Sequence, residues 1–184
     1  MIEIHIDEEA IKKAERLLET VPNGFERAMV SAFNRALQQG RTAGTREATK
    51  LYTLKSSTVR ETMAMHRASK NDISAALVSR GPRLALKHFA HKPTYDTTGA
   101  NRQQIRVAVR KGAMKPIGQG FIYRGMVMQR LGAPRLPIQQ KFSLAVPNIL
   151  EDDAIAEKIQ ETMGEAVEKR LEHETYRLLA GYGK

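Results

Sequence analysis

Residues that could catalyse a reaction or bind a metal are few and scattered in this sequence. The chain has no cysteine, which excludes disulfides, thiolate zinc sites and cysteine nucleophiles together. Among five histidines only His88 and His91 are close in sequence, and on a strand they would point to opposite faces. Ser56 and Ser57 have no partnered base in the sequence. We therefore predict no metal site and no nucleophile.

Acid–base catalysis and phosphate binding have equally little support. A pair of catalytic carboxylates would have to come from outside residues 71–147, whose only acids are Asp72 and Asp96. The other acids lie in amphipathic patterns typical of solvated helix faces. Residues 118–120, Gly-Gln-Gly, lack the Gly-Lys-Ser/Thr ending of a phosphate-binding loop and a following helix. We predict that the protein is not an enzyme and needs no cofactor.

The distribution of positive charge is the one feature of the sequence that points to a function. The chain carries a net charge of +10, yet residues 71–147 alone hold 13 Lys and Arg against 2 Asp and Glu. Residues 148–184 hold 5 against 9 and are acidic. Such segregation favours a polyanionic partner, either nucleic acid or an acidic protein surface. The alternative is a basic face that is simply solvated.

An expected strand at residues 102–111 concentrates this charge. Side chains alternate along a strand, so Arg102, Arg106 and Arg110 would share one face above a buried apolar side, and Lys111 follows. Guanidinium groups suit phosphates and carboxylates equally well. Aromatic residues make up only 5 % of the chain, which gives little support to a surface for stacking nucleobases.

Two helices are expected near the N-terminus, after a strand. Ile2, Ile4 and Ile6 alternate with polar residues, as in a half-buried strand. Asp7 then has the position of an N-cap, and the apolar spacing predicts a helix over residues 8–20, ended by Pro-Asn-Gly at 22–24. A second, long helix is expected over residues 25–51.

A row of small residues lies within the second helix: Ala36, Gly40, Gly44 and Ala48. Each glycine costs roughly 1 kcal/mol relative to alanine in a helix, and a close approach of another backbone would explain both. We expect close helix packing here, within the chain or between chains. A helix break near Gly40 is the alternative.

The middle of the chain is expected to be rich in short strands. After a short helix around residues 57–64, β-prone runs occupy 73–78, 84–89, 105–109 and 121–123, separated by glycine and proline turns. Residues 93–101 and 125–140 are expected to be irregular. Strands that follow one another without alternating with helices predict an α+β fold. In this fold N-terminal helices and a long C-terminal helix would pack on a mostly antiparallel sheet or small barrel. We expect one domain, divided into 1–66, 67–147 and 148–184.

The C-terminal helix is expected over residues 150–180. At 1.5 Å per residue it would be roughly 45 Å long, more than one domain of this size needs, so we expect part of it to pack on a neighbouring subunit. Four of its glutamates form a candidate acidic interface: Glu157, Glu161, Glu165 and Glu168.

No apolar run approaches the roughly 20 residues that cross a bilayer, so we expect no contact with membranes. Residues 1–7 lack the basic and then apolar layout of a signal peptide. We expect the chain to stay in the cytoplasm where it is made until it joins an assembly.

Several segments, in order, resemble the prophage minor tail protein Z family. The clearest run begins with Asn-Arg-Ala-Leu at 34–37 and continues through Thr-Arg-Glu-Ala-Thr-Lys at 45–50, and residues 123–127 and 130–132 lie outside the pattern. The matching segments are 34–37, 40–43, 45–50, 52, 54–55, 59–60, 109–112, 120–122, 136–138, 143–150 and 169–174.

The resemblance implies a structural protein of a long-tailed bacteriophage or prophage that completes the tail at its head-proximal end, by assembling as a ring. Its partners would be other tail or head–tail connector proteins, its place the virion tail, and its free form a monomer. A basic middle could meet an acidic helix of the next copy. The alternative is a DNA-binding accessory protein that contacts phage DNA without reading its sequence.

Overall fold

The computed structural model describes residues 8–98 and 103–181 and divides the chain into two compact units. The first, which we call the helical unit, comprises Met1–Gly44, Met63–Ser79 and Asp152–Lys184. The second, the β-rich unit, comprises Thr45–Thr62 and Arg80–Glu151. Each is described by itself, and the expectation of one domain over the whole chain stays a prediction. The expected strand at residues 2–6 lies outside the described residues.

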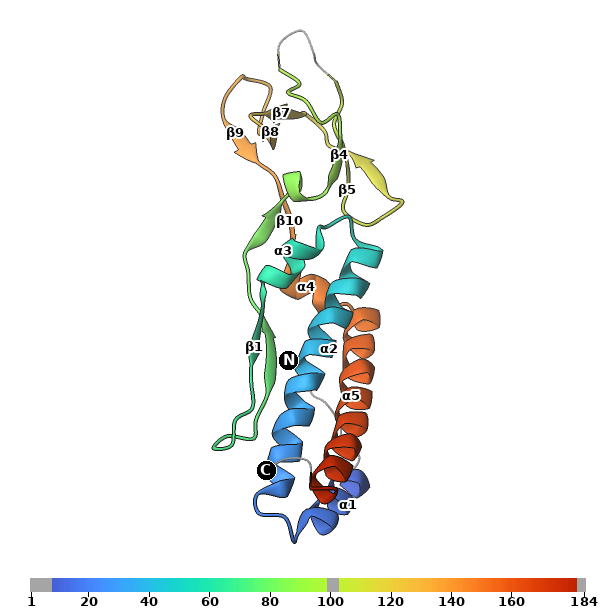
Figure 1. Ribbon diagram of the computed structural model, residues 1–184. Helices are drawn as coiled ribbons and strands as arrows, with labels where there is room; N and C mark the ends of the chain where they lie inside the picture. Colours follow the sequence, from blue (N-terminus) through green and yellow to red (C-terminus); the bar gives the residue numbers. More distant parts are fainter. Residues whose placement is uncertain (1–7, 99–102, 182–184) are drawn as a thin grey trace. The chain divides into compact units, whose positions relative to one another are not determined.

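Three helices make up most of the helical unit (Figure 1): α1 (Glu8–Leu18), the first part of α2 (Gly24–Leu51) and α5 (Asp153–Leu179). The helices α2 and α5 are antiparallel neighbours, because Ser31 contacts Glu174 while Gly40 lies against Met163. α1 packs on α5. A two-stranded antiparallel ribbon of β1 (Met63–His66) and β2 (Ala76–Ser79) completes the unit.

The core of the helical unit follows the apolar spacing of its helices. On α5 one apolar side is buried, and a buried aliphatic side chain stabilises the fold by roughly 1.5–3 kcal/mol. The buried residues of this side are Ile155, Ile159, Met163, Val167, Leu171 and Leu178. The helices expected at 8–20, 25–51 and 150–180 are thereby confirmed, with α5 starting a few residues late. α2 continues through Gly40 without a break.

The β-rich unit consists of short strands with two small helices, α3 (Ser56–Glu61) and α4 (Val146–Leu150). Its strands form three antiparallel sheets, β3 with β10, β4-β5-β6 and β7-β8-β9. A 3-10 turn, η1 (Leu86–His88), follows β3. Their bounds are β3 Arg83–Ala85, β4 Ala90–Lys92, β5 Arg106–Ala108, β6 Met114–Pro116, β7 Gly120–Tyr123, β8 Met126–Arg130, β9 Ile138–Gln140 and β10 Phe142–Ala145.

The α+β class is confirmed, since helices and antiparallel sheets both form large parts of the chain. Among the residues that the structure describes, the strands form small sheets of two or three members and no closed barrel.

The short helix expected around 57–64 is confirmed as α3, but it ends at Glu61, and β1 begins at Met63. Two local expectations were wrong. The segment 125–140 is not irregular, because it contains β8 and β9. The strand expected at 102–111 is limited within the described residues to Arg106–Ala108, since the chain bends at Val109.

A tight turn explains why β7 and β8 pair. Arg124 and Gly125 both have positive φ, 49° and 70°, as the two-residue turns of β-hairpins require. The carboxylate of Asp96 accepts hydrogen bonds from both backbone N–H groups, at 3.2 and 3.3 Å. This contact offsets the cost of a non-glycine residue at positive φ.

Candidate interaction surfaces

Reactive groups are dispersed in the structure. The described ranges 8–98 and 103–181 contain no cluster of three or more His, Asp or Glu side chains that could hold a metal ion. His91 uses its Nδ1 to donate to the Phe89 carbonyl at 2.9 Å, while His88 is exposed in η1. Within the same ranges no helix has the length and apolar content that crossing a membrane requires.

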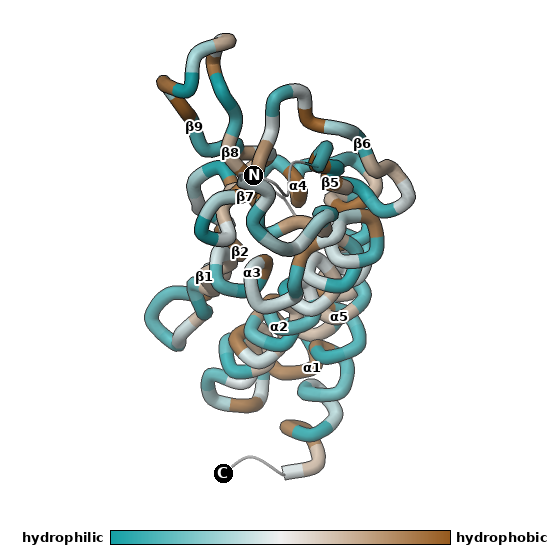
Figure 2. Tube along the Cα trace, turned by 90° about the horizontal axis from the view of Figure 1, so that it is seen from above, coloured by the Kyte–Doolittle hydropathy of each residue, from teal (hydrophilic) through white to brown (hydrophobic). Residues whose placement is uncertain are grey.

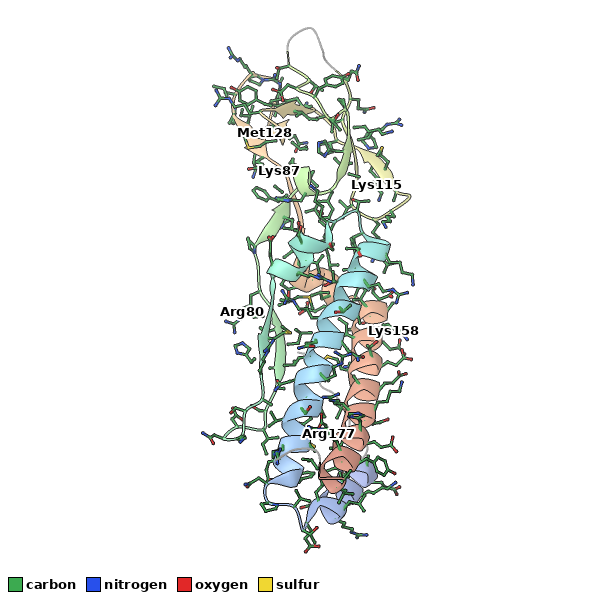
Figure 3. The ribbon with its side chains drawn as sticks, viewed as in Figure 1. Arg80, Lys87, Lys115, Met128, Lys158 and Arg177 are labelled. Carbon is green, nitrogen blue, oxygen red and sulfur yellow. The ribbon has the colours of Figure 1, made fainter. Side chains whose placement is uncertain are left out.

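Four glutamates, Glu157, Glu161, Glu165 and Glu168, form an exposed stripe on α5 that we call the acidic face. Their spacing places them within about 80° of one another around the helix. Two are paired with lysines of the same helix, Glu161 with Lys158 (labelled in Figure 3) and Glu165 with Lys169. Such exposed pairs add little stability, at most about 1 kcal/mol each, which leaves the glutamates available to a partner.

The row of small residues on α2 is buried. Ala36 and Ala48 are almost fully covered. A Cβ built on Gly40 would lie 2.3 Å from the Sδ of Met163, and one on Gly44 would lie 3.0 Å from the Cδ1 of Ile159. The two glycines therefore lie directly beneath side chains of α5, within the helical unit.

An ionic cluster around the buried Glu174 joins α2 and α5, and no feature of the sequence predicted it. The Glu174 carboxylate accepts from Ser31 Oγ at 2.9 Å and pairs with Arg170 at 2.6 Å and Arg177 at 2.7 Å. Burial raises the pKa of Glu174, but the hydrogen bonds from Ser31 and Arg177 and the two arginine charges outweigh it, so the pKa is lowered overall. Glu174 is thus held as an anion and ties the two helices together.

The predicted basic residues have different surroundings. Arg106 is exposed on β5, and Arg102 lies outside the described residues. Arg110 lies past the bend, with its guanidinium 5.3 Å from the centre of the Tyr52 ring and donating to the Tyr52 hydroxyl at 3.1 Å. The Lys111 N–H donates to the Leu51 carbonyl at 2.9 Å, and its side chain is exposed. Arg106 and Arg110 therefore do not belong to one strand.

The two units of the structure differ in the sign of their net charge. Counted along the sequence, the β-rich unit has 17 Lys and Arg against 4 Asp and Glu, and the helical unit has 13 against 16. Their net charges are +13 and −3. Lys87 and Lys115, labelled in Figure 3, are among the exposed cations of the β-rich unit.

The β7–β8–β9 sheet ends in a hairpin loop, residues 131–137, that exposes two leucines. Leu131 is 59 % exposed and Leu136 is 65 % exposed, and Figure 2 shows hydrophobic segments in the loop next to β9. Arg130 stacks on Phe121 at 5.0 Å and donates to the Arg135 carbonyl at 2.7 Å. The loop thus combines apolar and cationic side chains. We call it the leucine loop.

A shallow groove of about 300 Å³ runs between α1 and α5. Its apolar lining includes Leu17, Leu171 and Tyr176, and its charged lining consists of Lys13, Lys169, Glu168 and Glu172. Tyr176 is 60 % exposed. The helices expected at 8–20 and 150–180 gave no indication of a groove between them.

The described ranges have exposed charged and apolar surfaces and no grouped reactive side chains, and the comparison with family models identifies the chain as a structural protein of phage tails. Residues 7–181 match the family model described as Prophage minor tail protein Z (GPZ). The chain belongs to this family, which confirms the resemblance seen in the sequence. No curated protein and no solved structure matches the chain.

Family membership establishes the general role. The protein is a structural component of a phage or prophage tail, its place is the virion tail, and it associates with other tail components. A structural family also agrees with the prediction that the chain is not an enzyme.

Proposed function

We propose that the protein completes the tail at its head-proximal end, where copies assemble into a ring through head-to-tail contacts. The observation that carries this proposal is the opposite charge of the two units, +13 and −3. Two different surfaces on one chain make heterologous contacts, which close into a ring when the rotation between copies allows it.

Electrostatics would orient the copies as they meet. The exposed acidic face of α5 on one copy meets exposed cations of the β-rich unit on the next, among them Arg106 and Lys111. Complementary charges speed the encounter and disfavour wrong pairings more than they add affinity. Since these groups are exposed, salt screens them over a Debye length of about 8 Å at physiological ionic strength. The free protein is then a monomer in the host cytoplasm that assembles on the tail end, which supplies a template.

Electron microscopy of tails made with and without the protein tests this proposal. The account expects ring-shaped density at the head-proximal end that disappears when the protein is absent and returns when it is supplied. Mass measurement of the purified protein at low and high salt adds a second readout, with self-association expected only at low salt. Tails with the same density at both ends in the presence and absence of the protein would refute tail completion.

The charge of the β-rich unit also supports a second function, binding to phage DNA that is not specific for the DNA sequence. Each phosphate neutralised on duplex DNA contributes about −0.9 to the slope of log affinity against log salt. Replacing Arg106 and Lys111 with alanine should then weaken binding and lower that slope by about 2. Replacing Lys12 and Lys70, two exposed cations of the helical unit, with alanine is the matched control, because it removes the same charge elsewhere. A protein that does not bind duplex DNA even at low salt has no such function.

A further inference from the structure

Two features of the chain, a loop and a groove, expose large apolar side chains. Leu136, Tyr176 and Leu131 are its three most exposed large apolar side chains among the described residues, at 65 %, 60 % and 59 %. Two of them lie on the leucine loop, and the third lines the α1–α5 groove. Exposed apolar groups of this kind mark interaction sites.

Two hydrogen bonds close the leucine loop. It joins β8 to β9, and the Leu131 N–H donates to the Pro137 carbonyl at 3.2 Å across its base. The hydrogen bond from Arg130 to the Arg135 carbonyl closes it from the side. A loop held in one shape loses little conformational freedom when it binds.

The groove has room for this loop and carboxylates for its arginines. A cavity of roughly 150 Å³ accommodates a group the size of benzene, so a groove of about 300 Å³ has room for two leucine side chains. Four charged side chains line it, two of them cationic: Lys13, Lys169, Glu168 and Glu172. Lys169 pairs with Glu165, whereas neither Glu168 nor Glu172 forms an ion pair within the part of the chain that the structure describes. Residues 130–137 contain two arginines and no acid.

We propose that the leucine loop of one copy inserts Leu131 and Leu136 into the α1–α5 groove of the next copy, with Arg135 against Glu168 and Glu172. This inference rests on the proposed ring, for which it names the contact. The apolar insertion supplies affinity, and the flanking charges fix which end of the loop enters. The groove adjoins the acidic face at Glu168, so both belong to one continuous interface.

Disulfide trapping in assembled tails tests the contact, and a chain without cysteine gives no background. The variant Leu136→Cys/Tyr176→Cys alters two exposed positions, so the fold should be kept, which a thermal melt checks. After oxidation we expect a ladder of dimers and higher multimers on a non-reducing gel. The matched control Leu136→Cys/Glu15→Cys places the second thiol on α1 outside the groove and should give no ladder.

A charge exchange gives a second readout. Arg135→Glu should lower incorporation into tails about tenfold, a typical cost for a central interface contact. Combining it with Glu172→Arg, in the groove but not one of the four acidic-face glutamates, should restore incorporation.

The outcomes separate this inference from the proposed ring. A ring seen by electron microscopy without a ladder, with an intramolecular disulfide or with a cross-link to a different tail protein overturns the leucine-loop contact and leaves the ring intact. Absence of any ring at the tail end overturns both.

Discussion

Gly40 offers a quantitative test of how α2 packs on α5. In a helix, replacing glycine with alanine alone stabilises by about 1 kcal/mol. Here the new Cβ would lie 2.3 Å from Sδ and 2.5 Å from Cγ of Met163, and overpacking of a core typically costs about 1–3 kcal/mol. Gly40→Ala should therefore lower the free energy of unfolding by about 1 kcal/mol, the difference between these two effects.

Truncating the neighbour should reverse the sign. Met163→Ala by itself costs about 2–5 kcal/mol through the cavity it leaves. In that background the new Cβ meets no sulfur, so adding Gly40→Ala should stabilise the protein by about 1 kcal/mol. The coupling between the two sites is then about 2 kcal/mol, as expected of groups in contact.

Urea unfolding followed by helical circular dichroism measures all four members of this cycle. Gly118→Ala is the control, because nothing lies within 4 Å of the Cβ it adds, and it should shift stability by less than about 0.5 kcal/mol. If Gly40→Ala stabilises the parent protein as much as it stabilises Met163→Ala, the packing of Met163 on Gly40 is refuted.

Three further predictions concern charged groups. Because the pKa of Glu174 is lowered in the folded state, its contribution to stability is present above the ordinary glutamate value of 4.5 and is lost as the pH falls through the folded-state pKa. Glu174→Gln should cost about 1–3 kcal/mol at neutral pH and reduce the loss of stability on the acid side of a stability–pH curve. An unchanged acid side of that curve would contradict this. Glu157→Lys with Glu168→Lys should leave stability within about 0.5 kcal/mol yet abolish incorporation into tails, measured by quantitative blotting. In urea unfolding, Arg110→Ala should cost about 1 kcal/mol, because it loses the ring contact and the hydrogen bond with Tyr52. Arg106→Ala should cost less than about 0.5 kcal/mol. Equal costs would refute the contact between Arg110 and Tyr52.

The helices could be predicted because their signal is local. On α5 the residues Ile155, Ile159 and Met163 recur at the spacing of one helix side, and all are buried. The glycines of α2 likewise signalled a close approach. Their partners, Met163 and Ile159, are more than 110 positions away in the sequence, and no local pattern specifies such a pairing.

The β-rich unit shows where sequence reasoning fails. The β7–β8 turn has Arg and Gly at its centre instead of Asn-Gly or Asp-Gly, and its support comes from Asp96, 28 residues earlier. β8 carries two methionines, which give no strong strand signal. The ionic cluster of Glu174 was missed for the same reason, since Ser31 is 143 residues away.

Cryo-electron microscopy of the head-proximal tail end at side-chain resolution tests the central claim most directly, that copies meet through surfaces of opposite charge. The account predicts a ring in which the acidic face of α5 on each copy lies within ion-pair distance, about 4 Å, of cations from the β-rich unit of its neighbour. A ring in which the acidic face of every copy is turned to solvent, or meets no cation of a neighbouring copy, would contradict it.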